Sequence, residues 1–280
     1  MFHQSENIIP EKPILKILYQ DEYLVAVDKP AGLFVHRSFM DKNEIYFALQ
    51  LVRDQIGQYV YPIHRLDKPT SGVLLFALTH DVAQKMNKAF ADKSNALKND
   101  QSVSKNDFLN TPEQTLTKTY YALVRGHLSI SDQFTLIDYP LKEKLDKYGD
   151  KNVNRNKPPQ SALTNYHVIK HSTLPIPLGK FDSIRYSLIK LLPVTGRRHQ
   201  IRRHLSHLRH PIIGDINYGD NKQNPFFHQY FGFKRLMLIA KSLTFIHPIT
   251  LQQLTINAEF DEQWQHVFDV LNWDIEINQV

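Results

Sequence analysis

Residues 64–77 decide the fold of this chain; they read His64-Arg65-Leu66-Asp67-Lys68-Pro69-Thr70-Ser71-Gly72-Val73-Leu74-Leu75-Phe76-Ala77. Proline and glycine break the backbone in the first nine residues, and the last five form an apolar run typical of a buried strand. Asp67 therefore lies on a loop end, where a rigid scaffold commonly presents chemical groups. Pairing with Arg65, or with another cation brought near by the fold, would lower the pKa of Asp67 and keep it ionised. The alternative is a turn in which Asp67 only caps a neighbouring backbone group.

The composition excludes several classes of protein. The chain has 280 residues, 42% of them hydrophobic, which is enough for a sizeable core. It contains no apolar run long enough to span a membrane, and its first residues lack the layout of a signal peptide. It also has no cysteine, which removes disulfides, thiolate zinc sites and thiol nucleophiles together. We therefore expect a cytoplasmic protein that does not associate with membranes.

The positive charge of the chain is concentrated in one segment. The formal net charge is +6 and the pI about 9.2. Five arginines lie within residues 197–209, interleaved with histidines. The planar fork of arginine suits phosphate and base edges, so this cluster favours a nucleic-acid partner. Ile201, Leu205 and Leu208 have helical spacing, which predicts a helix over residues 197–208 with Arg198, Arg202 and Arg203 facing a groove or solvent.

The remaining hydrophobic patterns predict more strands than helices, without regular alternation, so we expect an α+β fold with a mixed or antiparallel sheet. The other expected helices cover residues 44–56, with Ile45, Leu49, Val52 and Ile56 on one face, and a segment capped by Thr79, with Val82, Met86 and Phe90 on one face. The expected strands cover residues 15–19, 23–27, 73–77, 118–126, 162–169, 185–192, 236–245 and 254–258.

Polar segments mark the expected boundaries. Residues 93–117 are rich in Ser, Asn, Asp, Lys and Gln, which predicts a long mobile insertion loop. A second exposed loop is expected over residues 146–160. We expect a flexible tail over residues 1–13, one catalytic domain over residues 14–270 and a second tail over residues 271–280.

Three segments together resemble the RluA-type pseudouridine synthases. These are the Asp67 loop, the strand Lys118-Thr119-Tyr120, and Thr195-Gly196-Arg197-Arg198-His199-Gln200-Ile201-Arg202. Lys29-Pro30-Ala31-Gly32 is similar to the N-terminal motif of that family, and the resemblance runs from about residue 14 to about 265. It is closest to the TruC type, which acts on uridine 65 of tRNA. Two departures concern specificity, namely the length of residues 93–117 and Ile239, where a histidine is common.

The resemblance implies a pseudouridine synthase fold with a catalytic cleft, and a tRNA-modifying isomerase that needs neither cofactor nor metal. It assigns Asp67 as the essential carboxylate, acting at C1′ or C6 or as a base at C2′, and it pairs Arg202 with Asp67. Tyr120 would stack on the base and serve in proton transfer. Arg65 would enter the RNA stack in place of the flipped uridine, or only contact a phosphate. The other implied RNA contacts are Arg197, Arg198, His199 and Arg203, and Ile201 would be a wall of the base pocket or plain core.

The sequence also bears on other functions, namely metal binding and nucleotide binding. The spacing of His204, His207 and His210 suggests a metal site, but the nearby arginines and the lack of acidic or thiolate ligands oppose it. No glycine-rich nucleotide-binding motif is present. The alternatives left open are a synthase acting on large-subunit rRNA and a non-catalytic RNA-binding or chaperone module. We expect a monomer.

Overall fold

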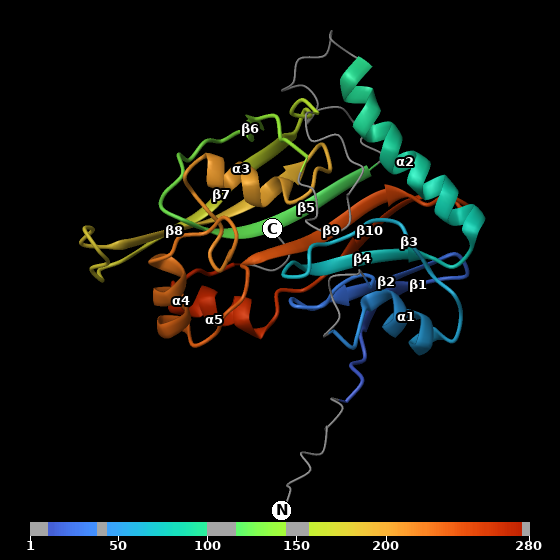
Figure 1. Ribbon diagram of the computed structural model, residues 1–280, viewed down its shortest axis with the longest axis horizontal. Helices are drawn as coiled ribbons and strands as arrows, with labels where there is room; N and C mark the ends of the chain where they lie inside the picture. Colours follow the sequence, from blue (N-terminus) through green and yellow to red (C-terminus); the bar gives the residue numbers. More distant parts are fainter. Residues whose placement is uncertain (1–10, 38–43, 100–115, 144–156, 276–280) are drawn as a thin grey trace, which may run out of the picture.

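A single ten-stranded sheet runs through the protein in the computed structural model (Figure 1), which describes residues 11–37, 44–99, 116–143 and 157–275. The strand order is β1-β2-β4-β9-β5-β8-β7-β6, with β10 beside β9 and β3 beside β4. The strands are β1 (Lys16–Gln20), β2 (Leu24–Lys29), β3 (Tyr61–Pro62), β4 (Ser71–Ala77), β5 (Leu116–Arg125), β6 (Thr135–Asp138), β7 (Leu163–Leu174), β8 (Ile184–Pro193), β9 (Leu238–Ile246) and β10 (Gln253–Asn257).

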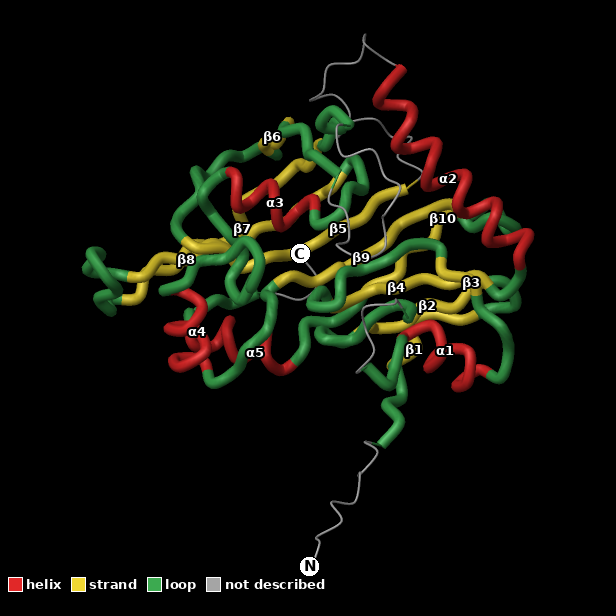
Figure 2. Tube along the Cα trace, viewed as in Figure 1, coloured by secondary structure: helices red, strands yellow, loops and turns green. Residues whose placement is uncertain are grey.

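The described residues form five helices, which lie around this sheet (Figure 2). They are α1 (Ala48–Ile56), α2 (His80–Asn99), α3 (Gln200–His207), α4 (Gln223–Phe231) and α5 (Glu262–Val270). All strand pairs are antiparallel except β4 with β9. The expected α+β class with a mixed sheet is therefore confirmed.

Both faces of strand β4 are covered by other parts of the protein. Every residue of β4 is buried. Leu74 and Phe76 belong to the core cluster under α1, whereas Val73, Leu75 and Ala77 belong to the cluster that includes α2. A strand buried on both faces needs the continuous apolar run seen in the sequence.

Gly72 allows β4 to approach β9. Its φ is 108°, and a Cβ atom there would lie 2.2 Å from the backbone oxygen of Ala240. The two strands pair in parallel only at Ser71 with Ile239 and at Gly72 with Ala240. This close approach joins the two halves of the sheet directly beside the Asp67 loop.

The helix after Thr79 is confirmed. The Thr79 Oγ1 accepts a hydrogen bond of 3.3 Å from the backbone N–H of Val82, and Val82 and Met86 are buried. The helix over residues 44–56 begins later than expected, at Ala48. Ala48, Leu51 and Val52 are its buried residues, and Leu49 and Ile56 pack against the same core while partly buried. Of the expected apolar face, only Ile45 is wrong, because it precedes the helix and is exposed.

Two predicted boundaries are corrected. Residues 93–99 continue α2 and residues 116 and 117 begin β5, so the loop predicted over 93–117 is too long at both ends. The segment in between, like residues 146–156 of the second predicted loop, lies outside the described residues. Residues 271–275 are no tail, because Leu271 and Trp273 are buried and the Trp273 indole donates to the carbonyl of His171. Helices α4 and α5 were not predicted.

The Arg-rich helix is also shorter than predicted. Helix α3 begins at Gln200, so Arg197, Arg198 and His199 lie in the turn before it. Ile201 and Leu205 are buried as expected. Of the two expected surroundings of Arg202, a groove or solvent, solvent is wrong: its side chain is only 2% exposed, because two carboxylates compensate its charge in the interior. Among the described helices, none combines the length and hydropathy that a membrane span requires.

Candidate active site

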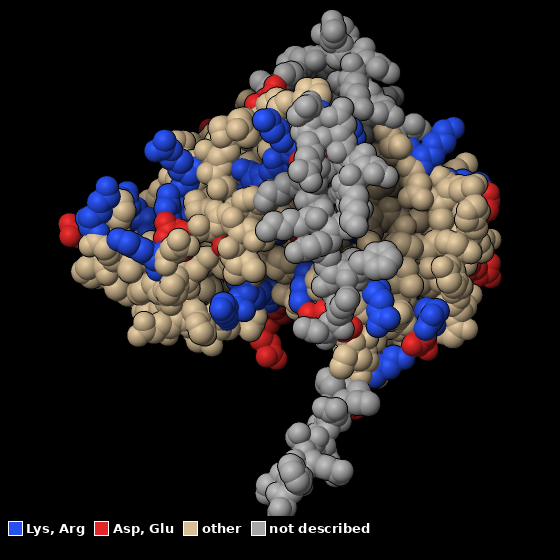
Figure 3. Space-filling model, in the orientation of Figure 1, with Lys and Arg blue, Asp and Glu red and all other residues tan. Residues whose placement is uncertain are grey.

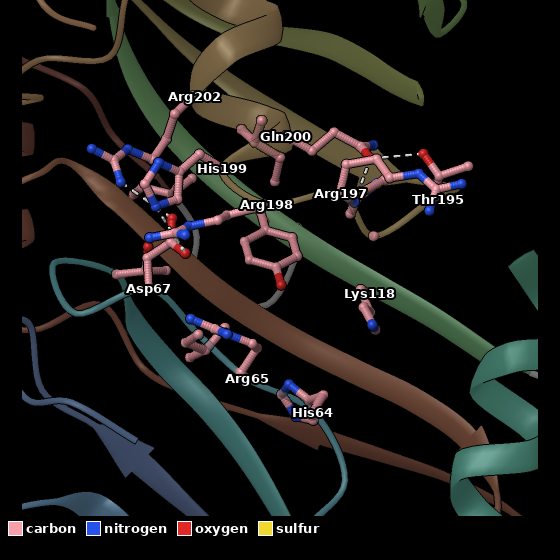
Figure 4. Close-up of a pocket in the computed structure, with 17 residues that line it drawn as sticks. His64, Arg65, Asp67, Lys118, Thr195, Arg197, Arg198, His199, Gln200 and Arg202 are labelled. Atoms are coloured by element: carbon pink, nitrogen blue, oxygen red, sulfur yellow. Dashed lines mark hydrogen bonds and ion pairs between the residues drawn. The ribbon is translucent and has the colours of Figure 1, made fainter. Parts of the chain in front are cut away.

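A cavity of about 450 Å³ lies between the loop before β4, strand β5 and the turn that leads into α3. These three segments are far apart in sequence, and the central sheet brings them together (Figure 4). The cavity is lined by His64, Arg65, Leu66, Asp67, Thr70, Lys118, Tyr120, Pro193, Thr195, Gly196, Arg197, Arg198, His199, Gln200, Ile201, Arg202 and Leu238.

Asp67 is surrounded by arginine and histidine side chains. Arg202 Nη1 donates to Asp67 Oδ2 at 3.2 Å, and His199 Nε2 lies 3.7 Å from Asp67 Oδ1. Arg198 also points toward this carboxylate (Figure 4). The Asp67 side chain keeps 19% of its surface exposed, so it can meet a ligand while it stays paired. Asp67 is therefore an oriented carboxylate at the wall of a cavity.

Asp215 holds the arginine that holds Asp67. Arg202 Nε and Nη2 each donate to a carboxylate oxygen of Asp215 at 2.7 Å, and both side chains are almost fully buried. Burial opposes the charge of Arg202, but the hydrogen bonds and charges of Asp215 and Asp67 outweigh it and raise the pKa of Arg202. Burial alone would raise the pKa of Asp215, but the hydrogen bonds and the charge of Arg202 outweigh this effect, so the pKa of Asp215 is lowered. Both groups are charged at neutral pH.

His199 adopts a backbone conformation that is rare for its residue type. Its φ is 54° and its ψ 29°, at the N-cap of α3. Its Nδ1 lies 3.0 Å from the hydroxyl of Tyr218, which leaves Nε2 facing Asp67. Strained backbone of this kind persists where the surrounding structure holds it, often at functional sites.

Gln200 fixes the turn before α3. Its Oε1 accepts from the Thr195 hydroxyl at 2.7 Å and from the backbone N–H of Arg197 at 3.0 Å. Its Nε2 donates to the carbonyl of Leu163 and to the hydroxyl of Thr164, both at 2.9 Å. Because Gln200 is buried, these four hydrogen bonds tie the Arg-rich turn rigidly to β7.

Lys29 supports the Asp67 loop from beneath. Its fully buried Nζ donates to the carbonyls of Pro30 and Leu33 at 2.8 Å and of Lys68 at 3.2 Å. Burial lowers the pKa of Lys29 to about 7, although the charge of Asp67 opposes this change. Lys29 therefore links the Lys29-Pro30-Ala31-Gly32 motif to the residue after Asp67.

Tyr120 and His64 form another part of the cavity wall. Tyr120 comes from β5, and burial followed by the negative charge of Asp67 raises the pKa of its phenol. Burial, together with Lys118, lowers the pKa of His64 to about 3, and its Nε2 accepts from the backbone N–H of Leu75. The phenol and the imidazole are therefore both neutral at pH 7.

The cavity brings together all the predicted site residues except one. Arg65, Asp67, Tyr120 and Arg202 line it, as do Arg197, Arg198, His199 and Ile201. Ile201 is both core and wall, since it is 7% exposed and lines the cavity. Arg203 is half-buried on α3 and does not line the cavity. Arg197 donates to the carbonyl of Ser161, on the side away from Asp67.

The sequence analysis missed Asp215, Tyr218 and Gln200 as parts of the site. Asp215 was read only as part of the segment that ends the Arg-rich helix. One signal could have found it, because it is the first acidic residue after a stretch that contains five arginines. A buried arginine needs such a partner.

The three histidines that suggested a metal site have other partners. His204 Nε2 faces the carbonyl of Tyr139 and Nδ1 faces the Thr164 hydroxyl, both at 3.0 Å. His207 stacks on Tyr139 and His210 faces the carbonyl of Arg125. Within the described ranges, no group of three or more His, Cys, Asp or Glu is placed to hold a metal ion.

The face shown in Figure 3 carries much positive charge. Lys and Arg side chains gather over the half of this face that holds α3 and the β7–β8 hairpin. The exposed or half-buried cations of these elements and the adjoining turns include Lys170, Lys180, Arg185, Lys190, Arg197, Arg198, Arg203, Arg209 and Lys222. Such a surface suits a polyanion that spans more than the cavity.

Comparisons with known proteins find relatives over most of this chain. The family model described as RNA pseudouridylate synthase matches residues 23–207. A protein from Vibrio cholerae named tRNA pseudouridine synthase C is 47% identical over 260 residues, covering 93% of this chain and 97% of its own length. A protein of the same name from Haemophilus influenzae is 47% identical over 261 residues, covering 93% and 99%.

Solved structures share the fold. Human RNA Pseudouridylate Synthase Domain Containing 1 has a TM-score of 0.60 at 23% identity, covering 88% of this chain and 83% of its own. Human RNA Pseudouridylate Synthase Domain Containing 4 has a TM-score of 0.60 at 24% identity, covering 92% and 93%. The family match extends over most of the chain and includes the Asp67 loop, Tyr120 and Arg202. This chain therefore belongs to the RNA pseudouridylate synthase family, and it is an isomerase.

Proposed function

We propose that this enzyme isomerises uridine to pseudouridine in tRNA, at uridine 65 of the T stem, with Asp67 as the essential carboxylate. The observation that carries the proposal is the pairing of Asp67 with buried Arg202 at the wall of a cavity that also holds Tyr120. The choice of tRNA is supported by relatives named tRNA pseudouridine synthase C that match nearly the full length of the chain.

The reaction balances without an outside group. The N1–C1′ bond breaks, the uracil rotates, and C5 bonds to C1′. The proton lost from C5 is matched by the one gained at N1, so no oxidant, reductant or transferred group is consumed. One oriented carboxylate, acting at C1′, at C6 or on the C2′ proton, supplies the chemistry. In each version Asp67 contacts the target nucleoside.

The neighbouring groups have distinct tasks. Arg202 keeps Asp67 ionised and oriented through their 3.2 Å hydrogen bond. Since its pKa is raised, Tyr120 stays protonated at neutral pH and can stack on the uracil or donate a hydrogen bond to it. The cavity volume of about 450 Å³ suits a small-molecule-sized group such as a flipped nucleoside.

A uridine in a stem must leave the helix to reach Asp67, which costs a few kcal/mol of unstacking. Arg65 is exposed, lines the cavity and lies two residues from Asp67, so its side chain can occupy the gap in the RNA stack. Arg197, Arg198, His199 and Arg203 would contact the phosphates on either side and offset the cost.

The test has two parts. Pseudouridine is mapped in total RNA from cells with and without the gene, and loss of the mark at tRNA position 65 is expected. Purified protein is then assayed on tRNA and large-subunit rRNA transcripts, beside the Asp67→Asn variant. A mark lost only from rRNA would contradict the choice of substrate, and turnover by Asp67→Asn would contradict the role of Asp67.

A further inference from the structure

A second cavity of about 650 Å³ lies on the other side of Asp67. It shares Asp67, Arg65, Arg198, His199 and Arg202 with the first cavity. The rest of its wall comes from other residues of the Asp67 loop and from three further segments, namely the loop at residues 31–36, the turn at 214–217 and the segment at 234–236. Of these three segments, the site described above uses only the turn at 214–217, where Asp215 binds Arg202.

The lining of this cavity matches the chemistry of a nucleotide. Phe34, Val35 and Leu236 give it apolar surface, and Lys234 lies exposed among its lining residues. A nucleobase has flat apolar faces, and its phosphate needs a cation. Sites for single-stranded nucleic acid commonly combine these two features.

Ile216 stands out in this wall. It is 81% exposed, although it sits on a turn that the structure holds firmly. Asp215 Oδ1 accepts from the backbone N–H groups of Asn217 at 2.9 Å and Tyr218 at 3.1 Å. The preceding Gly214 has a φ of 78°, and a Cβ there would lie 1.7 Å from the carbonyl oxygen of Arg235.

A single exposed isoleucine is ordinary on a protein surface. This one differs because a buried carboxylate that also binds Arg202 fixes its turn, so its position is tied to that of Asp67. An apolar side chain carried by a fixed turn at the wall of a cavity is suited to pack against a base.

Resting on the proposed function, we infer that the second cavity receives the nucleotide next to the target uridine, with its base packed against Ile216. The target base occupies the first cavity and its sugar lies at Asp67. Because Asp67 lines both cavities, a strand that continues from this sugar leads into the second one. Ile216 thus contributes to specificity, because it contacts the nucleotide beside the target uridine and so responds to the identity or the flexibility of that nucleotide.

The experiment uses tRNA stem-loops that are intact, or abasic at the nucleotide 5′ or 3′ of the target. Single-turnover rates are measured against enzyme concentration, giving a rate and a half-saturating concentration. For the native enzyme, one of the two abasic RNAs should bind about tenfold more weakly. Ile216→Ala should weaken binding of the intact RNA by a similar factor, and its binding should not weaken further when the same nucleotide is abasic. Ile216→Phe should still bind the intact RNA more tightly than that abasic RNA.

The matched control is Ile130→Ala, which truncates an isoleucine that is 68% exposed and lines neither cavity. It should behave as the native enzyme on all three RNAs. The inference would be overturned if Ile216→Ala and the abasic site each weakened RNA binding and their effects added in the combination. It would also be overturned if neither abasic RNA bound the native enzyme more weakly than the intact RNA. Absence of pseudouridine from intact RNA would instead count against the proposed function.

Discussion

Arg202 and Asp215 form a buried, two-pronged ion pair in which both hydrogen bonds measure 2.7 Å. This pairing uses Nε and Nη2, so Nη1 is the group that meets Asp67, at the longer distance of 3.2 Å. The shorter bonds fix the plane of the guanidinium. Asp67 therefore meets an arginine whose orientation is set by a carboxylate on another segment.

Asp215→Asn should lower both stability and catalysis. Loss of the buried ion pair costs about 3 kcal/mol, which corresponds to a fall in Tm of roughly 6–10 °C. The released guanidinium no longer orients Asp67, so the single-turnover rate at saturating enzyme should fall more than RNA affinity. Asp220→Asn is the control, because Asp220 also accepts backbone N–H groups and binds an arginine but lines neither cavity. A Tm loss with an unchanged rate would make Asp215 purely structural.

Asp67→Asn should reduce pseudouridine formation by about 10³-fold or more while RNA affinity stays within a few-fold of the native value. The amide is nearly isosteric but is no nucleophile and no useful base. Filter binding and chemical mapping of pseudouridine on the same RNA separate the two effects. Asp132→Asn, at an exposed position away from both cavities, serves as the control. A proportional loss of affinity would show that Asp67 acts mainly in binding.

Arg65→Ala should slow the reaction most on RNA whose target uridine is paired. If the guanidinium fills the gap left by the flipped base, an RNA with a mismatch at the target needs it less. The measurement is the ratio of single-turnover rates, native over variant, on paired and mismatched stems. If this ratio is the same for paired and mismatched stems, Arg65 only contacts a phosphate and does not fill the gap in the RNA stack.

Gly72→Ala should destabilise the protein strongly. The added Cβ would lie 2.2 Å from the Ala240 oxygen, and φ is 108°, so β4 and β9 must separate. We expect a loss of about 3 kcal/mol in the free energy of unfolding. Gly57→Ala is the matched control, because its φ is 73° and nothing lies within 4 Å of its Cβ position. Its cost should be near 1 kcal/mol. Equal urea midpoints for the two variants would contradict the close approach.

The stability of the protein should fall as the pH drops from about 6.5 to about 4. Burial lowers the pKa of His204 to about 4, although its hydrogen bond to the carbonyl of Tyr139 opposes this change. The neutral ring can accept from the Thr164 hydroxyl while it donates to that carbonyl. In this window the unfolded chain binds a proton that the folded chain does not, so the free energy of unfolding decreases with falling pH. The gap between 6.5 and about 4 corresponds to roughly 3 kcal/mol.

Urea unfolding of His204→Asn at several pH values should give a flatter profile than the native protein. Asparagine keeps an acceptor for the Thr164 hydroxyl but does not titrate. Ser206→Asn introduces the same amide on the same helix without changing a titratable group, so it should leave the profile unchanged. A native-like slope in His204→Asn would assign the pH dependence to another group.

Local patterns predicted the elements that make the site. The apolar run after Gly72 defined β4, the spacing of Ile201 and Leu205 defined α3, and the motif around Asp67 marked the carboxylate. These signals are local, since each depends on residues within one or two turns or on one strand. The pairing of Asp67 with Arg202 came from family resemblance, and both residues do line one cavity.

Contacts between residues far apart in the chain could not be predicted from local sequence patterns. Nothing local says that Asp215 reaches Arg202, or that Trp273 returns to the core beside His171. Helix α4 did have a local signal, because Phe227 and Phe231 are buried four residues apart, but the helix is short and contains Pro225. The burial of Arg202 was missed because arginine is usually exposed.

The Asp67 loop opens directly into β4, and β4 is completed on one edge by β9, which ends at Ile246. During synthesis, the ribosome must therefore release nearly the whole chain before that edge is paired. A truncated product that stops before β9 keeps the Asp67 motif, Arg202 and Asp215, but leaves β4 unpaired there and lacks Leu238 from the cavity. Nonsense mutations late in the gene should consequently yield insoluble, inactive chains, and no fragment ending before Leu238 should complement a null strain.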